Sequence, residues 1–402
     1  MGKRGEKLGG GLPRQGVHAL RIALFTAFSP EIGGGSAQLR SHLRFLPELD
    51  VTWYYLAEQP AKQSHENWKW LGERLNPGEL LSDMSARSRF LPGSKQRVRE
   101  IVAQMSADLY WVLGHYEGIS VAAELQEQNK PVHLTIHDDP FGTWARSNRY
   151  KWFQPLLLRT FPRVLRGAKN VDVTSWGMRN LYRQVYGVKC CAVYLHVAEL
   201  PSLNVTRDSR KLTMGHIGTL YQHEPFERFL AASKQIAAEQ QRALRVIRIG
   251  ASPELDTFSE RDPEIFEAHG DLEEETALPL LASCDLLYAM YPSGRKFERF
   301  RRTSLPIKLS SYVQAQRPIF AHAPRDSTLA RIVGPWRVGK VCASDDQAAI
   351  KSQLGEALQT AVPRENFERL RNDLMGLDQV KQLGAALRHE DWSAYPEHDF
   401  RA

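Results

Sequence analysis

Residues 211–218, KLTMGHIG, form a short apolar run that ends in a glycine, and this run decides how the chain is divided. The segment before it, ELPSLNVTRDSRK (199–211), is polar, contains a proline and shows no clear period, which is typical of a linker between domains. On both sides of this linker, apolar runs of strand length alternate with segments of helical period. The alternation predicts an α/β protein with two similar domains, each built on a parallel sheet.

The expected elements alternate in the same way in both halves. In the first half, the expected strands are residues 20–28, 50–56, 108–114, 131–138 and 170–175. In the second half, they are residues 211–218, 244–250, 265–270, 285–292 and 317–323. Helices are expected over 36–46, 224–240, 273–283 and 306–316. We therefore predict a basic tail (1–18), an N-terminal domain (19–198), the linker (199–211), a C-terminal domain (212–380) and a final segment (381–402) that returns to the N-terminal domain.

Charge and composition limit the classes of partner. The 402-residue chain carries a formal net charge of +7, which indicates an anionic partner such as a phosphorylated substrate, a membrane surface or nucleic acid. No nucleic-acid-binding motif accompanies the charge, so nucleic acid is not expected. No apolar run approaches the roughly 20 residues of a membrane span. The four cysteines contain no Cys-x-x-Cys pair, which favours reduced thiols in the cytoplasm over a zinc site or a disulfide framework.

A glycine-rich segment lies between the first expected strand and the helix that follows it. Gly33, Gly34 and Gly35 let the backbone approach a ligand closely, and the N–H groups that begin a helix bind phosphate. The segment therefore predicts a phosphate site. Its spacing is not the Rossmann fingerprint, so a flexible strand-to-helix turn is the alternative interpretation.

Polar side chains follow two other strands of the first half. His137 and Asp138 lie at the end of strand 131–138, and His115 and Tyr116 follow strand 108–114. Ligands of open α/β sheets collect at the carboxyl ends of the strands, so these residues are candidates for binding a substrate or transferring a proton. The alternative is a buried histidine beside aspartates, Asp138 and Asp139, that cap the next helix.

In the second half, a basic loop precedes a helix. The loop PSGRKFERFRRTS (292–304) ends in Ser304, the expected cap of the helix that holds Lys308, and Pro306 is expected in the first turn of that helix. Helix dipole, lysine and arginine side chains can converge on a diphosphate. The alternative is an exposed basic loop. Its cationic residues are Arg295, Lys296, Arg299, Arg301 and Arg302.

Residues 146–169 combine basic and aromatic residues without an acidic one. They run from Arg146 to Lys169 and suit the headgroup layer of an anionic membrane. A solvated helix face with a buried aromatic side explains the same composition. The segment therefore leaves peripheral contact with the inner face of the cytoplasmic membrane as an open expectation.

Taken in order, these segments resemble the GT-B glycosyltransferases, especially the large retaining family that includes bacterial mannosyl- and glucosyltransferases of surface-polysaccharide assembly. The resemblance covers residues from about 20 to 385. It rests on five stretches in sequence: GGGSAQLRSHL (33–43), LTIHDDP (134–140), NVDVTSWGMRNLYRQVYGV (170–188), MGHIGTL (214–220) and PIKLSSYVQAQRPIFA (306–321). It implies two Rossmann-like domains whose sheets face a central cleft.

The resemblance also implies roles for the candidate residues. A nucleoside-diphosphate sugar is the co-substrate, no cofactor or metal is needed, and the acceptor is a glycan or lipid-linked hydroxyl. His137 and Asp138 are then catalytic, and His115 and Tyr116 bind the acceptor. The residues expected to bind the donor are Gly33, Gly34, Gly35, Gly218, Thr219, Arg299, Arg301, Arg302, Thr303, Ser304, Lys308 and Ser311.

Several positions depart from the family pattern. Thr303 and Ser311 stand where the family commonly has two glutamates, and Thr219 stands where an arginine is usual. Loss of an acid that accepts hydrogen bonds from ribose hydroxyls weakens nucleotide binding unless other acceptors replace it. A glycosyltransferase is the leading hypothesis, and a GT-B binding protein without transfer activity is the alternative. A nucleoside-diphosphate-sugar epimerase ranks below both, with Asp138 and Asp139 as its acid and base candidates.

Overall fold

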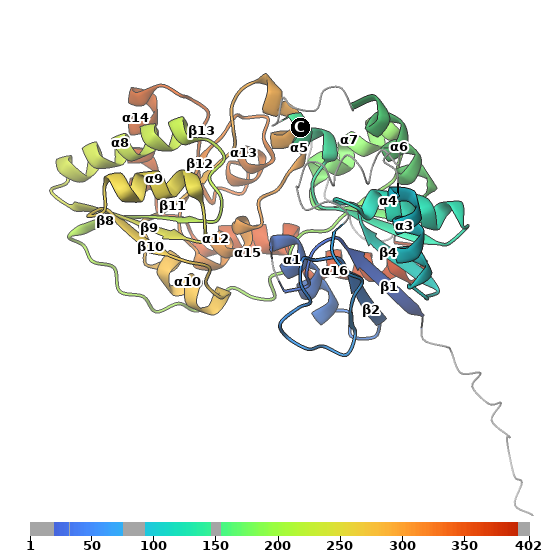
Figure 1. Ribbon diagram of the computed structural model, residues 1–402. Coiled ribbons are helices and arrows are strands. Elements are labelled where there is room, and N and C mark those ends of the chain that lie inside the picture. Colours follow the sequence, from blue (N-terminus) through green and yellow to red (C-terminus); the bar gives the residue numbers. More distant parts are fainter. Residues whose placement is uncertain (1–19, 32, 75–92, 146–153, 393–402) are drawn as a thin grey trace, which may run out of the picture.

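The computed structural model describes residues 20–31, 33–74, 93–145 and 154–392, which form two α/β domains (Figure 1). The N-terminal domain contains a seven-stranded sheet in the order β3-β2-β1-β4-β5-β6-β7, and its strands pair in parallel. The strands are β1 (Arg21–Thr26), β2 (Asp50–Tyr55), β3 (Trp68–Trp70), β4 (Leu109–Leu113), β5 (Val132–Ile136), β6 (Asn170–Val173) and β7 (Cys191–Ala192). The helices are α1 (Gly34–Arg44), α3 (Ser94–Ala103), α4 (Gly118–Glu127), α5 (Pro140–Ala145), α6 (Gln154–Gly167) and α7 (Trp176–Tyr186).

The C-terminal domain contains a six-stranded parallel sheet in the order β10-β9-β8-β11-β12-β13. Its strands are β8 (Lys211–Ile217), β9 (Ala243–Ile249), β10 (Phe266–His269), β11 (Leu286–Met290), β12 (Ile319–His322) and β13 (Gly339–Cys342). The helices of this half are α8 (His223–Glu239), α9 (Pro253–Arg261), α10 (Glu274–Ala282), α11 (Glu298–Thr303), α12 (Lys308–Ala315), α13 (Thr328–Val333), α14 (Gln347–Gln359), α15 (Arg364–Leu374) and α16 (Leu377–Leu387).

The ten strands expected from the sequence are all present in the two sheets, so the predicted α/β architecture is confirmed. Central strands β4, β5 and β11 are buried along their whole length, as continuous apolar runs between two helical layers should be. Strands β3, β7 and β13 were not predicted. They are short strands at the sheet edges, where fewer apolar side chains are needed to cover a strand.

The last helix of the described chain lies against the N-terminal domain. Val380 and Leu383 of α16 are fully buried in the same core cluster as Leu24 of β1 and Trp111 of β4. Asn170 Nδ2 at the start of β6 donates to Ala386 O over 2.7 Å, and Trp392 Nε1 donates to Asn170 Oδ1 over 3.2 Å. The chain therefore crosses between the domains twice, once along the linker and once between α15 and α16 (Figure 1).

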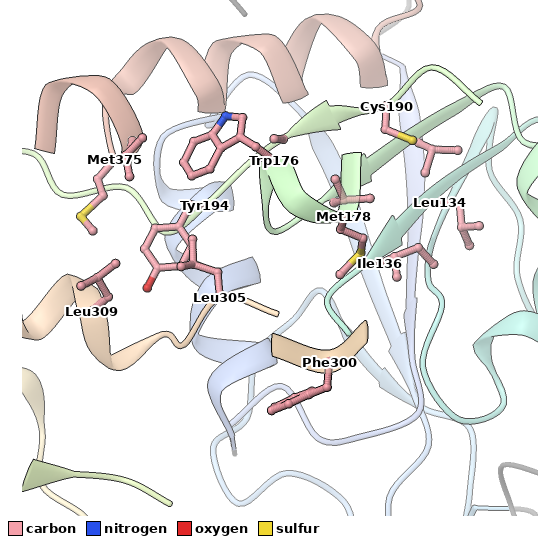
Figure 2. Packing of buried hydrophobic residues seen from close by; sticks show 14 of the residues in the cluster. Leu134, Ile136, Trp176, Met178, Cys190, Tyr194, Phe300, Leu305, Leu309 and Met375 are labelled. Carbon is pink, nitrogen blue, oxygen red and sulfur yellow. The ribbon is translucent and has the colours of Figure 1, made fainter. Parts of the chain in front are cut away.

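Helix α11 of the C-terminal half packs against α5 and α7 of the N-terminal domain. Phe300 is buried there, and Leu305 and Leu309 lie beside Tyr194 and Met375 (Figure 2). Two glycines allow this close approach. A methyl group on Gly142 would lie 3.0 Å from Phe300 Cα, and one on Gly177 would lie 1.9 Å from Arg302 O.

We expect Gly177→Ala to loosen this contact between the domains. The added methyl overlaps a backbone oxygen of α11, and relieving such an overlap costs about 1–3 kcal/mol of unfolding free energy. Denaturant titration monitored by tryptophan fluorescence measures the loss. The matched control is Gly355→Ala in α14, where a methyl meets nothing within 4 Å and should stabilise the helix by up to about 1 kcal/mol. Equal stability of Gly177→Ala and wild type would contradict the described contact.

Candidate functional site

Lys308 begins α12 and reaches the turn that follows β8. Its Nζ donates to Thr219 O over 2.9 Å, and a methyl group on Gly218 would lie 3.9 Å from Nζ. The ammonium also lies 5.9 Å from the centre of the Tyr221 ring. Burial lowers the pKa of Lys308 to about 7, because a charged ammonium is less well solvated there than in water. The turn and the lysine thus place a readily charged group at the carboxyl end of a central strand.

His216, which the sequence pattern does not single out, supports this arrangement from within the sheet. Its ring is 1% exposed, and Nε2 lies 3.0 Å from Gly218 O and 3.3 Å from Lys308 Nζ. Nδ1 lies 3.1 Å from Tyr288 O in the neighbouring strand. Burial, followed by the charge of Lys308, lowers the pKa of His216 to about 3, so the ring is neutral at pH 7. A histidine inside an apolar strand gives no sequence signal that separates it from the core.

In the N-terminal domain, the glycine segment lies against His137. Gly33 precedes α1 with a φ of 89°, which favours glycine, and a methyl group on Gly35 would lie 3.0 Å from His137 Nδ1. Burial lowers the pKa of His137 to about 4. Its Nε2 is buried without a hydrogen-bond partner among the described residues. A neutral imidazole with one unsatisfied ring nitrogen is suited to hydrogen-bond a ligand hydroxyl.

The expected acceptor residues lie near the glycine segment, next to Phe28. The rings of His115 and Tyr116 are in contact, with centroids 3.8 Å apart, and the ring of Phe28 lies 6.5 Å from that of His115. Phe28 Cζ would in turn lie 3.1 Å from a methyl group on Gly35. Tyr116 has a φ of 47°, which is uncommon for a residue other than glycine. The structure therefore brings His115, Phe28 and the glycine segment together.

Two contacts join the candidate residues of the N-terminal domain to those of the C-terminal domain. A methyl group on Gly34 would lie 2.7 Å from Ile307 Cδ1, and Ile307 is the residue before Lys308. Ser304 Oγ lies 3.4 Å from Asp138 Oδ1. The segments that follow β1, β5 and β8 thus meet near the start of α12.

Asp139 forms a dense polar contact between the domains. Its side chain is fully buried and caps α5 by accepting from Gly142 N over 2.7 Å. It also accepts from Tyr182 over 3.1 Å and from Arg299 Nε and Nη2 over 2.6 and 2.9 Å. Burial opposes the charge of Arg299, but the hydrogen bonds and charge of Asp139 outweigh it and raise the pKa of the guanidinium.

The arginines expected to surround a diphosphate are instead held by separate carboxylates. Arg299 pairs with Asp139, Arg301 makes a two-pronged contact with Asp326 at 2.7 and 2.8 Å, and Arg302 pairs with Glu298 on the protein surface. These partners lie in different parts of the fold. In this structure the three arginines are therefore paired with carboxylates, whereas Lys308 Nζ reaches the turn after β8. Binding of the donor by these arginines stays a prediction.

The hydroxyl residues of the basic loop have local partners as well. Thr303 is buried, donates to Arg299 O over 2.7 Å, and its carbonyl accepts from the Ser175 hydroxyl. Ser304 ends α11, and α12 begins at Lys308, so Ser304 does not cap α12 as expected. Ser311 is partly exposed on α12. The Thr303 side chain itself is 2% exposed and bonds within α11.

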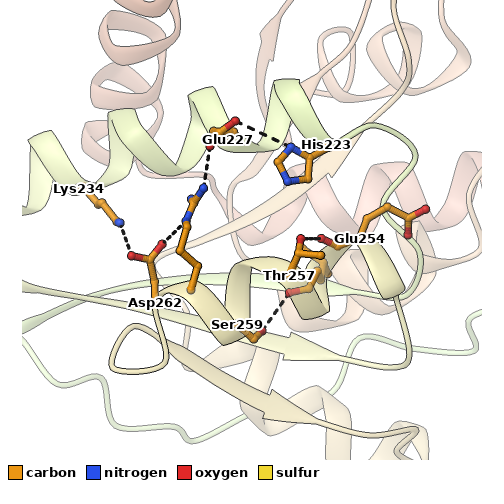
Figure 3. Close-up of polar contacts among 9 residues, drawn as sticks. His223, Glu227, Lys234, Glu254, Thr257, Ser259 and Asp262 are labelled. Atoms are coloured by element: carbon orange, nitrogen blue, oxygen red, sulfur yellow. Dashed lines mark hydrogen bonds and ion pairs between the residues drawn. The ribbon is translucent and has the colours of Figure 1, made fainter.

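A second pair of turns adjoins the site in the C-terminal domain. A methyl group on Gly250, after β9, would lie 3.5 Å from Gly218 Cα and 3.6 Å from Asp271 Oδ1. Helix α9 starts just beyond this turn, and an ion-pair network ties it to α8 (Figure 3). In this network Arg261 contacts Glu227 at 2.8 Å and Asp262 at 3.1 Å, and Asp262 contacts Lys234 at 2.8 Å. The network joins the C-terminal end of α9 to α8.

The basic segment expected at a membrane is described only in part. Residues 146–153 lie outside the described residues. In α6 and just after it, Arg159, Arg163, Arg166 and Lys169 are exposed, while Phe161 is fully buried in the core. Among the described residues, no helix has the length and apolar character needed to cross a membrane. Within the same ranges, no cluster of three or more His, Cys, Asp or Glu side chains is arranged to hold a metal ion.

Solved structures resemble this chain along most of its length, although no family model and no curated protein sequence matches it. Sucrose-phosphate synthase from Thermosynechococcus elongatus aligns with a TM-score of 0.69 and 14% identity, covering 92% of this chain and 98% of that one. A lipopolysaccharide outer core galactosyltransferase aligns with a TM-score of 0.58 and 12% identity, covering 92% and 99%. A putative UDP-N-acetylglucosamine 2-epimerase from Listeria monocytogenes aligns with a TM-score of 0.56 and 11% identity, covering 92% and 96%.

These similarities show the fold: the chain has the GT-B architecture, as expected from the sequence. At such identities they carry no statement about individual residues of the site.

Asp139→Asn tests the contact between the domains. The amide removes the charge that balances Arg299 and leaves one hydrogen bond mismatched, so we expect a loss of about 2–4 kcal/mol in unfolding free energy. Chemical denaturation of both proteins at pH 7 measures it. Arg302→Gln is the control, because its exposed pair with Glu298 should contribute at most about 1 kcal/mol. If both variants lose equally little, Asp139 does not hold the domains together.

Proposed function

We propose that this protein transfers a sugar from a nucleoside-diphosphate donor to a hydroxyl group of a glycan or lipid-linked acceptor. The observation that carries the proposal is the position of Lys308, at the first residue of α12 and over the Gly218–Thr219 turn. This arrangement supplies an ammonium, helix N–H groups and a close-approach turn at one place, which is what a diphosphate requires. The similar solved structures named for galactosyl transfer and sucrose-phosphate synthesis support the same class of reaction.

In this proposal, departure of the nucleoside diphosphate is the step that the C-terminal domain assists. Negative charge grows on the leaving phosphate oxygen as the bond to the sugar carbon breaks. Protonated Lys308 and the first N–H groups of α12 are already positioned to stabilise this charge, so little reorganisation is needed during the reaction. Thr219 and Gly218 contribute backbone groups from the turn. Retention of the sugar configuration and independence of metal ions remain expectations from the family resemblance.

The N-terminal domain would position the transferred sugar and its acceptor. His137 is neutral at pH 7 and has a buried, unsatisfied Nε2 among the described residues, so we assign it to hydrogen-bond a sugar hydroxyl. Asp138 lies beside Ser304 at the boundary, and we assign it to accept a proton from the acceptor hydroxyl. His115 and Tyr116 form the neighbouring aromatic surface that we assign to the acceptor.

Peripheral attachment to an anionic membrane would suit a lipid-linked acceptor. Its support is the run of exposed cations at the end of α6, Arg159, Arg163, Arg166 and Lys169. We propose a cytoplasmic protein that contacts the inner membrane face through this surface. Because Phe161 is buried, we attribute the attraction to the membrane to these charges and not to insertion of this aromatic ring.

An epimerase is the second candidate, since one similar structure is that of a putative UDP-N-acetylglucosamine 2-epimerase. Epimerisation requires an acid and a base on the two sides of one sugar carbon. Asp139 is unsuited to this role, because its carboxylate accepts four hydrogen bonds that join α5, α7 and α11. Asp138 alone would remain of the two candidates. The position of Asp139 therefore favours transfer over epimerisation.

The first test is binding of nucleoside diphosphates. Uridine, guanosine, adenosine and thymidine diphosphates are each titrated against the protein by calorimetry, and a ligand specific for the folded state should also raise Tm. We expect one base to bind best and Lys308→Met to weaken its binding at least tenfold. Lys340→Met, which removes an exposed lysine of β13, should bind as wild type does. Absence of binding to wild type at millimolar concentration would support the inert GT-B protein instead.

Protonation of Lys308 provides an independent signature. With a pKa of about 7 in the free protein, Lys308 is mostly neutral at pH 8, and a bound diphosphate should raise its pKa. At pH 8 the protein should therefore take up close to one proton for each diphosphate that binds. At pH 6 the uptake should be smaller, because the lysine is already charged. Calorimetry in two buffers of different ionisation enthalpy measures the uptake. Proton uptake that persists in Lys308→Met would assign it to another group.

Transfer itself is tested with the best-binding nucleotide carrying candidate sugars. Wild type should produce free nucleoside diphosphate when a hydroxyl acceptor is present. His137→Ala should still bind the nucleotide, but it should produce free diphosphate at least tenfold more slowly. A sugar nucleotide that is converted to its epimer without release of the diphosphate would identify the second candidate.

A further inference from the structure

A cavity of about 370 Å³ lies at the edge of the C-terminal sheet opposite Lys308. Its walls include Arg242 just before β9, Asp285 just before β11 and Arg317 just before β12, so it opens at the amino ends of the strands. The turns of the candidate site follow the carboxyl ends of the same sheet. The length of the strands therefore separates the two places. Its volume falls in the range of small-molecule sites.

Positive charge dominates this cavity. Three guanidinium groups line it, from Arg207, Arg242 and Arg317, and one carboxylate, Asp285, lies among them. Asp285 contacts Arg242 at 2.8 Å and Arg207 at 3.6 Å, and it accepts from Thr213 N over 2.9 Å. One carboxylate compensates one of the three positive charges. The lining as a whole keeps two positive charges in excess.

Arg317 has few partners inside the protein. Its Nε donates to Ala282 O over 2.6 Å at the end of α10, which is an ordinary position for a cation near a helix C-terminus. That contact uses one of five N–H groups, and no carboxylate pairs with Arg317 among the described residues. Burial and then the charge of Arg207 lower the pKa of Arg317, as expected in a locally positive field. The contact with the end of α10 therefore does not account for the other N–H groups of Arg317.

Arg242 leaves a donor unsatisfied in the same wall. Its Nη2 donates to Lys211 O and Asp285 and its Nη1 to Gln240 Oε1, but Nε is buried without a partner among the described residues. Buried N–H groups are rarely left unpaired in proteins. Arg242 therefore contributes to this wall a guanidinium that is not fully paired among the described residues.

We propose that this cavity binds a small phosphomonoester with several hydroxyl groups, at a site separate from the candidate donor site. A phosphomonoester carries nearly two negative charges at pH 7, which matches the two excess positive charges, and guanidinium groups bind its oxygens in pairs. The amides of Gln240 and Gln359 and the hydroxyl of Thr360 line the remainder of the wall and are suited to a polyol. The site does not depend on glycosyl transfer.

The ligand would also fasten the interdomain linker. Arg207 belongs to the linker, whereas Arg242 and Arg317 belong to the C-terminal domain. The linker already contacts this domain where Gln316 Nε2 donates to Pro201 O over 2.7 Å. A phosphate held by Arg207 and Arg317 would add a further attachment, close to the start of β8 and beside the contact of Arg207 with Asp285.

The test is calorimetric titration of the full chain with glucose 6-phosphate, inorganic phosphate, glucose and acetate, at constant ionic strength and pH 7.5. We expect saturable binding of the two phosphates, tighter for glucose 6-phosphate, and no binding of glucose or acetate. Arg207→Gln and Arg317→Gln should each weaken the binding at least fivefold. Arg207 is about half exposed, so its variant should fold even if Arg317→Gln does not.

Two control variants show whether the bound phosphate occupies this cavity. Arg210→Gln removes a linker arginine that is 88% exposed and pairs with Asp208, and it should bind glucose 6-phosphate as wild type does. Lys308→Met should also leave this binding unchanged. The proposal is overturned if Arg207→Gln binds like wild type, if acetate binds as well as phosphate, or if Lys308→Met abolishes the binding. The last result would place the phosphate at the candidate donor site.

Discussion

The buried carboxylate of Asp139 is the contact on which the arrangement of the two domains depends. It caps α5, accepts from Tyr182 of α7 and binds both prongs of Arg299 from α11. A buried charge of this kind is tolerated only when its partners are all in place, so it selects one relative position of these helices. That position brings Gly34 to Ile307 and Ser304 to Asp138, and thereby assembles the candidate site from both domains.

The fold was predictable because its signals are local. Apolar runs such as residues 285–292 and 131–138 are long enough to identify buried strands, and the polar segment 199–211 separates their two series. The glycine segment and Lys308 could likewise be proposed as site residues, because each adjoins a strand or helix end that the sequence marks. The pairing of Arg299 with Asp139 joins residues 160 positions apart. No periodicity or spacing encodes such a contact, so the sequence could not predict that Arg299 pairs with Asp139.

Thr303 shows how the position of a residue can exclude the side chain that a family resemblance leads one to expect. Its backbone carbonyl is bonded to Ser175, and its hydroxyl is bonded within α11, in a region where Gly177 leaves no room for even a methyl group. Tight packing of α11 against α7 thus favours a small residue at position 303. If the protein transfers sugars, the acid it requires must come from another element, and Asp138 is a carboxylate that the structure places beside the end of α11.

The return of α16 to the N-terminal domain affects the order in which the chain can fold during synthesis. The core around Leu24 and Trp111 includes Val380, Leu383 and Trp392, so the first domain to leave the ribosome lacks part of its interior until almost the whole chain has been made. The C-terminal sheet draws its strands from one continuous stretch, Lys211 to Cys342, and can form earlier. The domain that is translated first is thus the one that is completed last.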